Sequence, residues 1–216
     1  MRKAGFTLLE ILIVIAVIAV LALITINISR RIENQSKERL TENTIAIINA
    51  ALTQFKDYGY EYHDPNYRAF VFPLDCNGFN DAGLVGTLQS ATGAAVVGDG
   101  VNPADHQNEY SGCEAMYYLL SNIPSCRETL DKIDKSLITG KGFTSQNMTI
   151  TIGGVSRPLL RIIDPWGTTL MYDYYDEWET NVVLRYAGRR TFPVITSAGP
   201  DKKFGTMDDI NGVSHP

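Results

Sequence analysis

Four carboxylates gather in one short stretch near the C-terminal end of the chain, together with three aromatic side chains. The carboxylates are Asp173, Asp176, Glu177 and Glu179, and the aromatic residues between them are Tyr174, Tyr175 and Trp178. Paired carboxylates can supply the acid and the base of glycoside hydrolysis, and interleaved rings suit a sugar-binding surface. A solvated hairpin tip is the simpler interpretation of such a charge run, and the sequence favours it.

Other residues with catalytic or metal-binding chemistry are dispersed. The chain has no G-x-S-x-G nucleophile motif, no G-x-x-x-x-G-K-[ST] phosphate loop and no C-x-x-C pair. His63, His106 and His215 are scattered without the spacing of zinc ligands. The sequence therefore predicts a protein that is not an enzyme.

Three cysteines, Cys76, Cys113 and Cys126, follow the apolar N-terminal segment. In an exported domain, an oxidising environment predicts one disulfide and one free thiol. Cys113 and Cys126 flank a short predicted helix, 114–121, that Pro124 closes, so this pair is favoured for the disulfide.

The N-terminus places one carboxylate, Glu10, inside a long apolar run from Phe6 to Ile28, after the basic leader Met1–Gly5. The run is long enough to span about 30 Å of hydrocarbon. A carboxylate at mid-bilayer costs about 2.5 to 3.5 kcal/mol, so its position calls for a functional reason. No A-x-A site follows the run, which argues against an ordinary secretory signal; a plain transmembrane anchor remains an alternative.

The order of basic leader, Gly5, Phe6, Glu10 and apolar helix resembles the class III signal of type IV pilins and pseudopilins. The resemblance implies that a prepilin peptidase cuts between Gly5 and Phe6 and that Phe6 is then N-methylated. It also implies that Glu10 neutralises the terminal amine of a neighbouring subunit, and that the leader faces the cytoplasm.

The helix is predicted to continue beyond the membrane, because 29–57 holds no proline or glycine. An apolar stripe recurs at helical period, formed by Ile45, Ile48, Leu52 and Phe55. A helix from Phe6 to Phe55 is about 75 Å long. The pilin resemblance implies a transmembrane half, 6–28, and a periplasmic half, 29–57, covered by a globular domain. Ala19 and Asn27 stand where the family commonly has a glycine and a proline.

The 216 residues suffice for one membrane helix and one soluble domain with its own core. The net charge of −5, without a concentrated basic patch, argues against nucleic-acid binding. The middle, 58–163, is expected to be a variable insertion at the surface. Within it, 149–152 and 159–163 are predicted strands around a Gly153-Gly154 turn.

Asp164-Pro165-Trp166-Gly167 has the residues that a type I turn prefers. Segments 168–174, 182–186 and 192–197 follow as predicted strands of an antiparallel meander. The DPWG turn, a strand ending in S-A-G-P-D and the segment F-G-T-x-D-D-I together resemble the C-terminal half of the major pseudopilin of type II secretion systems.

That resemblance implies a structural calcium ion in the last loop. The ligands it carries over are the side chains of Asp201, Asp208 and Asp209 and backbone carbonyls near Ala198 and Thr206. Six to eight oxygens suit Ca²⁺, and Gly205 permits the loop to wrap. The alternative is an ordinary acidic tail.

Together these observations predict an α+β, pilin-like lollipop, with a long N-terminal helix on a small antiparallel sheet, 164–216, that ends in the calcium loop. The expected function is that of a structural subunit of a periplasmic pseudopilus for type II protein export. The alternatives are a type IV pilus subunit for adhesion, motility or DNA uptake, or a membrane-anchored exported hydrolase or lectin. The expected partners are further copies of the chain, minor pseudopilins, a prepilin peptidase and an assembly platform. The expected location is the inner membrane, crossed once, with the globular domain in the periplasm.

Overall fold

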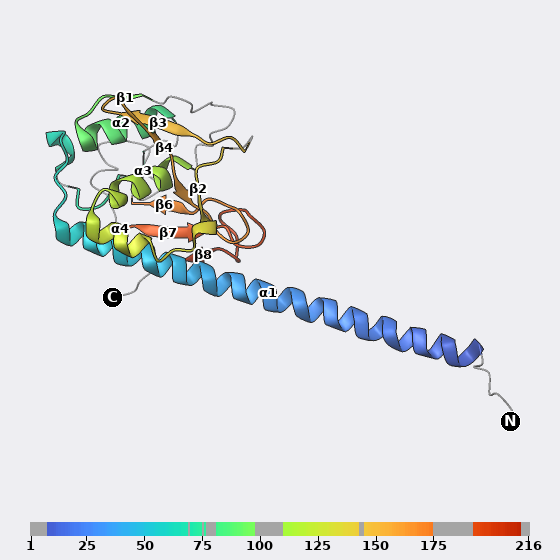
Figure 1. Ribbon diagram of the computed structural model, residues 1–216. Helices are drawn as coiled ribbons and strands as arrows, with labels where there is room; N and C mark the ends of the chain where they lie inside the picture. The colour runs from blue at the N-terminus through green and yellow to red at the C-terminus, as the bar shows by residue number, and fades with distance from the viewer. Residues whose placement is uncertain are drawn as a thin grey trace. The chain divides into compact units, whose positions relative to one another are not determined.

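The computed structural model of the chain describes residues 8–68, 70–74, 76, 81–97, 110–142, 145–174 and 192–212. For 20, 22–30, 67, 81–83 and 110 it describes the backbone alone. The chain divides into two units, Met1–Arg39 and Leu40–Pro216, which are treated separately below (Figure 1).

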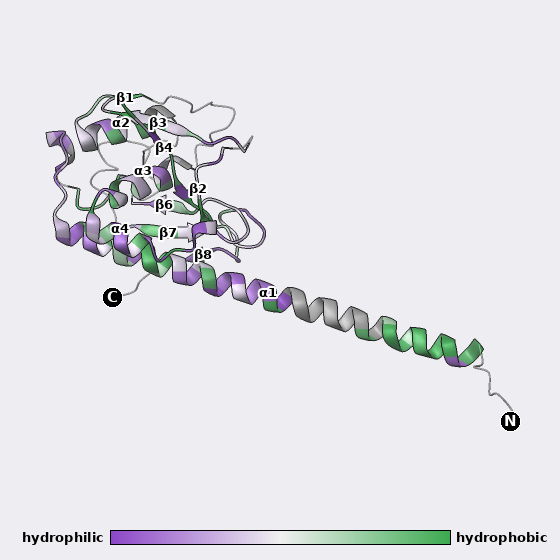
Figure 2. Cartoon of the chain, viewed as in Figure 1, coloured by the Kyte–Doolittle hydropathy of each residue, from purple (hydrophilic) through white to green (hydrophobic). Residues whose placement is uncertain are grey.

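The described residues of the N-terminal unit, from Leu8 onward, form the first part of helix α1 (Leu8–Tyr58). Its first turns are apolar (Figure 2), and their described side chains are exposed, for example Leu8, 83% exposed, and Leu21, 58% exposed. The turns near Arg39 are polar, and Lys37 pairs with Glu33 at 2.8 Å, one helical turn apart. The continuous helix predicted from the absence of proline and glycine is confirmed for the described residues.

The predicted membrane-spanning segment, 6–28, lies partly outside the described residues. Across the part of the chain that the structure describes, no helix combines the length and the apolar character needed to cross a bilayer.

In the C-terminal unit, α1 buries the stripe that its sequence predicted. Ile45, Ile48, Leu52 and Phe55 are all at most 2% exposed. The helix ends at Tyr58, and the next residue, Gly59, donates its N–H to Lys56 O at 3.1 Å and has a φ of +68°, which suits glycine. The helix therefore ends one residue beyond the predicted segment 29–57.

The middle of the chain forms much of the core, so the expectation of a surface insertion is wrong. It contains the helices α2 (Asp81–Thr92), α3 (Tyr110–Ser121) and α4 (Pro124–Leu130), and two short 3-10 helices, η1 (Pro65–Tyr67) and η2 (Lys135–Leu137). Leu84, Leu88, Met116 and Leu119 are at most 1% exposed. Helix α3 contacts α2, α4, β5 and β6, which places it among the other elements of this unit.

In the described residues, the strands form three small antiparallel sheets. One has the order β1 (Val96–Val97), β3 (Thr149–Ile152), β4 (Val155–Pro158). The second pairs β2 (Ile138–Thr139) with β5 (Arg161–Ile162), and the third has the order β6 (Met171–Asp173), β7 (Val194–Ser197), β8 (Ile210–Asn211). An α+β class is therefore confirmed.

One predicted hairpin differs in its second strand. The turn Gly153-Gly154 leads directly into β4, with Ile152 opposite Val155. The predicted strand 159–163 contributes only β5, which pairs with β2 in another sheet. The four residues of β4 are exposed, so they lack the apolar signal by which a strand is recognised.

Strand β8 is held against α1 by a close backbone approach. The Asn49 amide donates to Gly212 O at 3.3 Å, and Gly212 N–H donates to Ile195 O at 2.9 Å. A Cβ atom at Gly212 would overlap the Ile45 Cγ2 methyl. Only glycine at this position lets the C-terminal strand lie flush on the helix.

Candidate functional site

The N-terminal site is described only at Glu10. Glu10 lies in the first turn of α1 and is exposed. A carboxylate at this end of a helix is favoured by the helix dipole. Gly5 and Phe6, the predicted cleavage and methylation residues, lie outside the described residues.

The predicted DPWG turn forms, and Asp164 holds it together. Asp164 Oδ1 accepts hydrogen bonds from the N–H groups of Trp166, at 3.0 Å, and Thr168, at 2.8 Å. Gly167 N–H donates to Asp164 O at 2.9 Å, which closes the turn. Asp164 is only 2% exposed, so these bonds form in a buried environment.

Asp164 also connects this turn to the acidic loop that follows β7. Its Oδ2 accepts a hydrogen bond from the Ser197 hydroxyl at 2.7 Å, and Ser197 Oγ accepts one from Gly199 N–H at 3.1 Å. Gly199 has a φ of +63°, and a Cβ there would overlap Asp208 O. The two segments singled out by sequence, 164–167 and 197–209, are therefore joined.

The acidic loop is closed by its own carboxylates. Asp208 Oδ2 accepts from Asp201 N–H at 3.1 Å, Asp201 Oδ1 from Lys203 N–H at 2.8 Å, and Asp209 Oδ2 from Gly205 N–H at 2.7 Å. The Thr206 hydroxyl donates to Asp208 Oδ1 at 2.5 Å. This hydroxyl, and then the Asp201 N–H, lowers the pKa of Asp208 below its usual value of 3.8.

The calcium ligands implied by the resemblance lie in this loop, but their side chains do not point at one common position. Among the described residues, no group of three or more His, Cys, Asp or Glu side chains is arranged to hold a metal ion. Each Asp carboxylate already accepts a main-chain N–H. The other oxygen of Asp209, Oδ1, is buried and has no hydrogen-bond partner among the described residues. Of the carbonyl candidates, Thr206 O accepts from Asp209 N–H at 3.5 Å, and Ala198 is fully buried.

The favoured disulfide between Cys113 and Cys126 is not formed, and all three cysteines are buried free thiols. Cys113 Sγ accepts from Ile162 N–H at 3.4 Å, whereas Cys126 Sγ lies 3.4 Å from Ala51 O. The Cys113 thiol on α3 therefore faces β5, whereas the Cys126 thiol on α4 faces α1. Burial raises the pKa of Cys113 to about 12.

The acidic and aromatic stretch 173–179 is described only at its beginning. Asp173 is 6% exposed and Tyr174 is 1% exposed. Asp173 pairs with Val194 in the sheet, so it is not part of a solvated tip as the sequence predicted. Asp176, Glu177, Trp178 and Glu179 lie outside the described residues.

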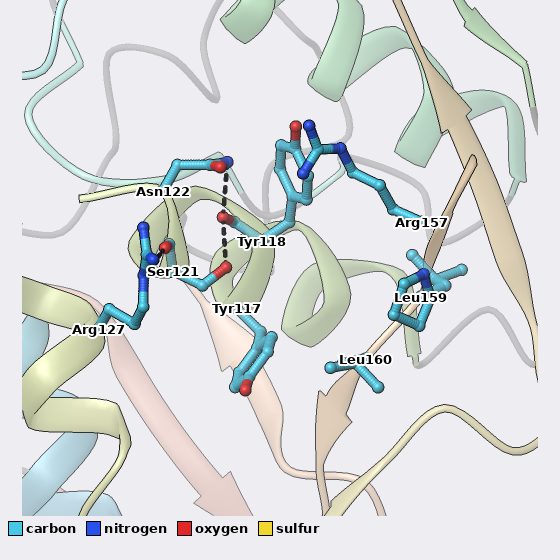
Figure 3. A pocket seen from close by; sticks show the side chains of 9 residues that line it. Tyr117, Tyr118, Ser121, Asn122, Arg127, Arg157, Leu159 and Leu160 are labelled. Carbon is cyan, nitrogen blue, oxygen red and sulfur yellow. Dashed lines mark hydrogen bonds between the residues drawn. The ribbon is translucent and has the colours of Figure 1, made fainter. Parts of the chain in front are cut away.

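A hollow that the sequence did not indicate lies at the C-terminal end of α3. We call it the arginine hollow; it has a volume of about 300 Å³, and its polar lining comprises Tyr117, Tyr118, Ser121, Asn122, Arg127 and Arg157. Figure 3 shows Arg127 and Arg157 approaching the end of α3 from different sides. The two arginines lie 30 residues apart in sequence, so no local motif could have brought them together.

Comparison with known protein families identifies a motif at the N-terminus. The family described as "Prokaryotic N-terminal methylation motif" matches residues 1–26. No curated protein and no solved structure matches the chain significantly. The motif supports a pilin-like protein with a prepilin-type signal, and it implies processing by a prepilin peptidase and assembly into a polymer.

Proposed function

We propose that the chain is a structural subunit of a periplasmic pseudopilus that drives protein export by a type II secretion system. It is cut after Gly5, methylated at Phe6 and assembled through its N-terminal helix. The observation that carries the proposal is the methylation motif at residues 1–26, which runs into a helix whose apolar side chains are exposed.

The exposed apolar side chains of α1 require a covering. Ile11, Leu12, Val14, Ile15 and Ile18 are all more than half exposed. Burying apolar surface yields about 25 cal/mol per Å², and a helix that is apolar all round is normally surrounded by lipid or protein. Before assembly, the lipid of a membrane would cover these side chains. After assembly, neighbouring copies of the chain would cover them. Glu10 would then meet the terminal amine of the adjacent copy.

The assignment to type II secretion rests on the C-terminal region. The DPWG turn and the acidic loop that resemble those of the major pseudopilin are joined through Asp164, Ser197 and Gly199. Buried Asp173 and Tyr174 weaken the alternative of an exported hydrolase or lectin. The proposed location is the inner membrane, with the C-terminal unit in the periplasm, and the proposed partners include minor pseudopilins and an assembly platform.

Calcium belongs to this proposal as a structural ion. Three carboxylates in one loop repel one another without a cation, and oxygen ligands are those that Ca²⁺ prefers. The orphaned, buried Asp209 Oδ1 supports a cation there. The side chains of Asp201 and Asp208, now bonded within the loop, would supply further oxygens after a change of rotamer.

The experiment that tests the function compares Glu10→Leu with Glu38→Leu in cells that secrete through this system. Both changes replace an exposed carboxylate on α1. Glu10→Leu should insert into the membrane as well as the parent chain does, yet yield no filaments in a shear fraction and no secretion. Glu38→Leu should retain both.

Filaments of normal length from Glu10→Leu would contradict the charge-pairing role. Loss of surface filaments after deletion of the gene, with secretion unchanged, would assign the chain to a type IV pilus instead.

A further inference from the structure

The arginine hollow has a neighbour, and the two share a wall. The second hollow, about 520 Å³, has one carboxylate in its lining, Glu61, beside Tyr60, Tyr62, His63 and Arg68, and we call it the tyrosine hollow. Tyr118 and Asn122 line both. The two hollows are therefore adjacent sites on one face of the C-terminal unit.

The arginine hollow is cationic in a chain that is acidic overall. Two guanidinium groups line it and no carboxylate does, whereas the net charge of the chain is −5. Arg127 Nε donates to Ser121 O at 2.8 Å, which fixes the side chain at the end of α3. Within the described part of the chain, the Arg157 side chain makes no ion pair or hydrogen bond, while its backbone pairs with Ile150 in the sheet. A guanidinium presents a planar fork of donors that matches a carboxylate.

The aromatic side chains add a second recognition element. Burial raises the pKa of both Tyr117 and Tyr60, so these rings stay neutral at physiological pH. Figure 3 shows the Tyr118 ring beside the Arg157 side chain. Tyrosine offers a flat apolar face and a hydroxyl at its edge, which suits a sugar ring bearing both C–H and O–H groups.

The neighbouring strand disfavours a peptide ligand. Strand β4 is the edge of its sheet, and its exposed side would be the place for an added strand. Leu159 N–H donates inward to Met148 O at 3.0 Å, so the preceding nitrogen, that of Pro158, points outward and carries no hydrogen. A proline on an edge blocks strand addition.

We propose that the two hollows bind successive rings of an acidic polysaccharide built from uronic acids. The carboxylate of one ring meets Arg157 and Arg127, and that of the next meets Arg68. Tyr118, on the shared wall, contacts both rings. The proposed binding does not use the methylation motif, because every residue invoked belongs to the C-terminal unit and none lies within residues 1–26.

The test is calorimetric titration of the full chain, held in a micelle of a sugar-free zwitterionic detergent, with trigalacturonate. Binding is expected in the micromolar to millimolar range, with maltotriose, a neutral trisaccharide, giving no heat. Arg157→Gln should weaken binding at least tenfold. It should fold normally, since the side chain is exposed and unbonded. Lys135→Gln removes a charge that lines neither hollow and should bind like the parent chain.

Three results would overturn the proposal. One is the absence of trigalacturonate binding at several millimolar. Another is equal affinity for the peptide Glu-Glu-Glu, which would show a general anion site. The third is equal weakening by Lys135→Gln and Arg157→Gln, which would show attraction to overall charge.

Discussion

Asp208 is the residue whose ionisation is most closely tied to the acidic loop. Its pKa is lowered first by the Thr206 hydroxyl, so the bonds it accepts stabilise the loop above its usual pKa of 3.8 and are lost as the pH falls through the folded value. Thr206→Val should raise the Asp208 pKa toward 3.8, measured by carboxyl NMR titration. The Asp134 pKa, lowered by Ser136, is the internal control and should not move. An unchanged Asp208 pKa would contradict the role of the hydroxyl.

At the scale of the elements, the contact between β8 and α1 should be the most sensitive to one added methyl group. Gly212→Ala places a methyl against Ile45, so we expect a loss of about 1–3 kcal/mol in the free energy of unfolding, as for other overpacked sites. Gly86→Ala is the matched control, because nothing lies within 4 Å of its Cβ position in α2. This control should gain about 0.5–1 kcal/mol from helix propensity. Thermal melting of both variants in the same detergent decides, and equal stability of the two would contradict the close approach.

The acidic loop, as an element, carries the calcium prediction. Millimolar calcium should raise the melting temperature, since a ligand at a hundredfold excess over its Kd stabilises the fold by about 2.7 kcal/mol. Asp209→Asn should abolish the rise, because it replaces the carboxylate whose Oδ1 has no partner. Glu128→Gln, on α4, should keep it. A parent chain that does not respond to calcium would leave an acidic tail as the explanation.

At the scale of the whole molecule, we predict that the leader is removed after Gly5. Mass spectrometry of the membrane-extracted chain should find a mature N-terminus at methylated Phe6. Replacing Gly5 by a bulky residue should leave the leader attached, because the peptidase must accommodate this side chain, whereas Gly5→Ala should be partly processed. Any other N-terminus would contradict the pilin-like assignment.

Features of this chain that neighbouring residues encode can be predicted from the sequence, whereas features that depend on tertiary packing cannot. The periodic stripe of α1 and the turn at Asp164 were predicted from neighbouring residues alone. Helix α2 was missed because Gly83 and Gly86 weaken its intrinsic propensity, although Leu84, Leu88 and Ala91 lie at helical spacing and are buried. The arginine hollow and the separation of Cys113 from Cys126 depend on which elements pack together, and no motif encodes that.

The burial of all three cysteines has a practical consequence. A thiol with a pKa of about 12, as at Cys113, holds almost no thiolate at neutral pH, and the thiolate is the reactive form. Cys76, Cys113 and Cys126 are each at most 1% exposed. The folded chain should therefore not react with maleimides. One cysteine introduced on its surface can then carry a fluorophore or a crosslinker without the removal of any natural cysteine. Conversely, labelling of the parent chain reports directly on how often its core opens.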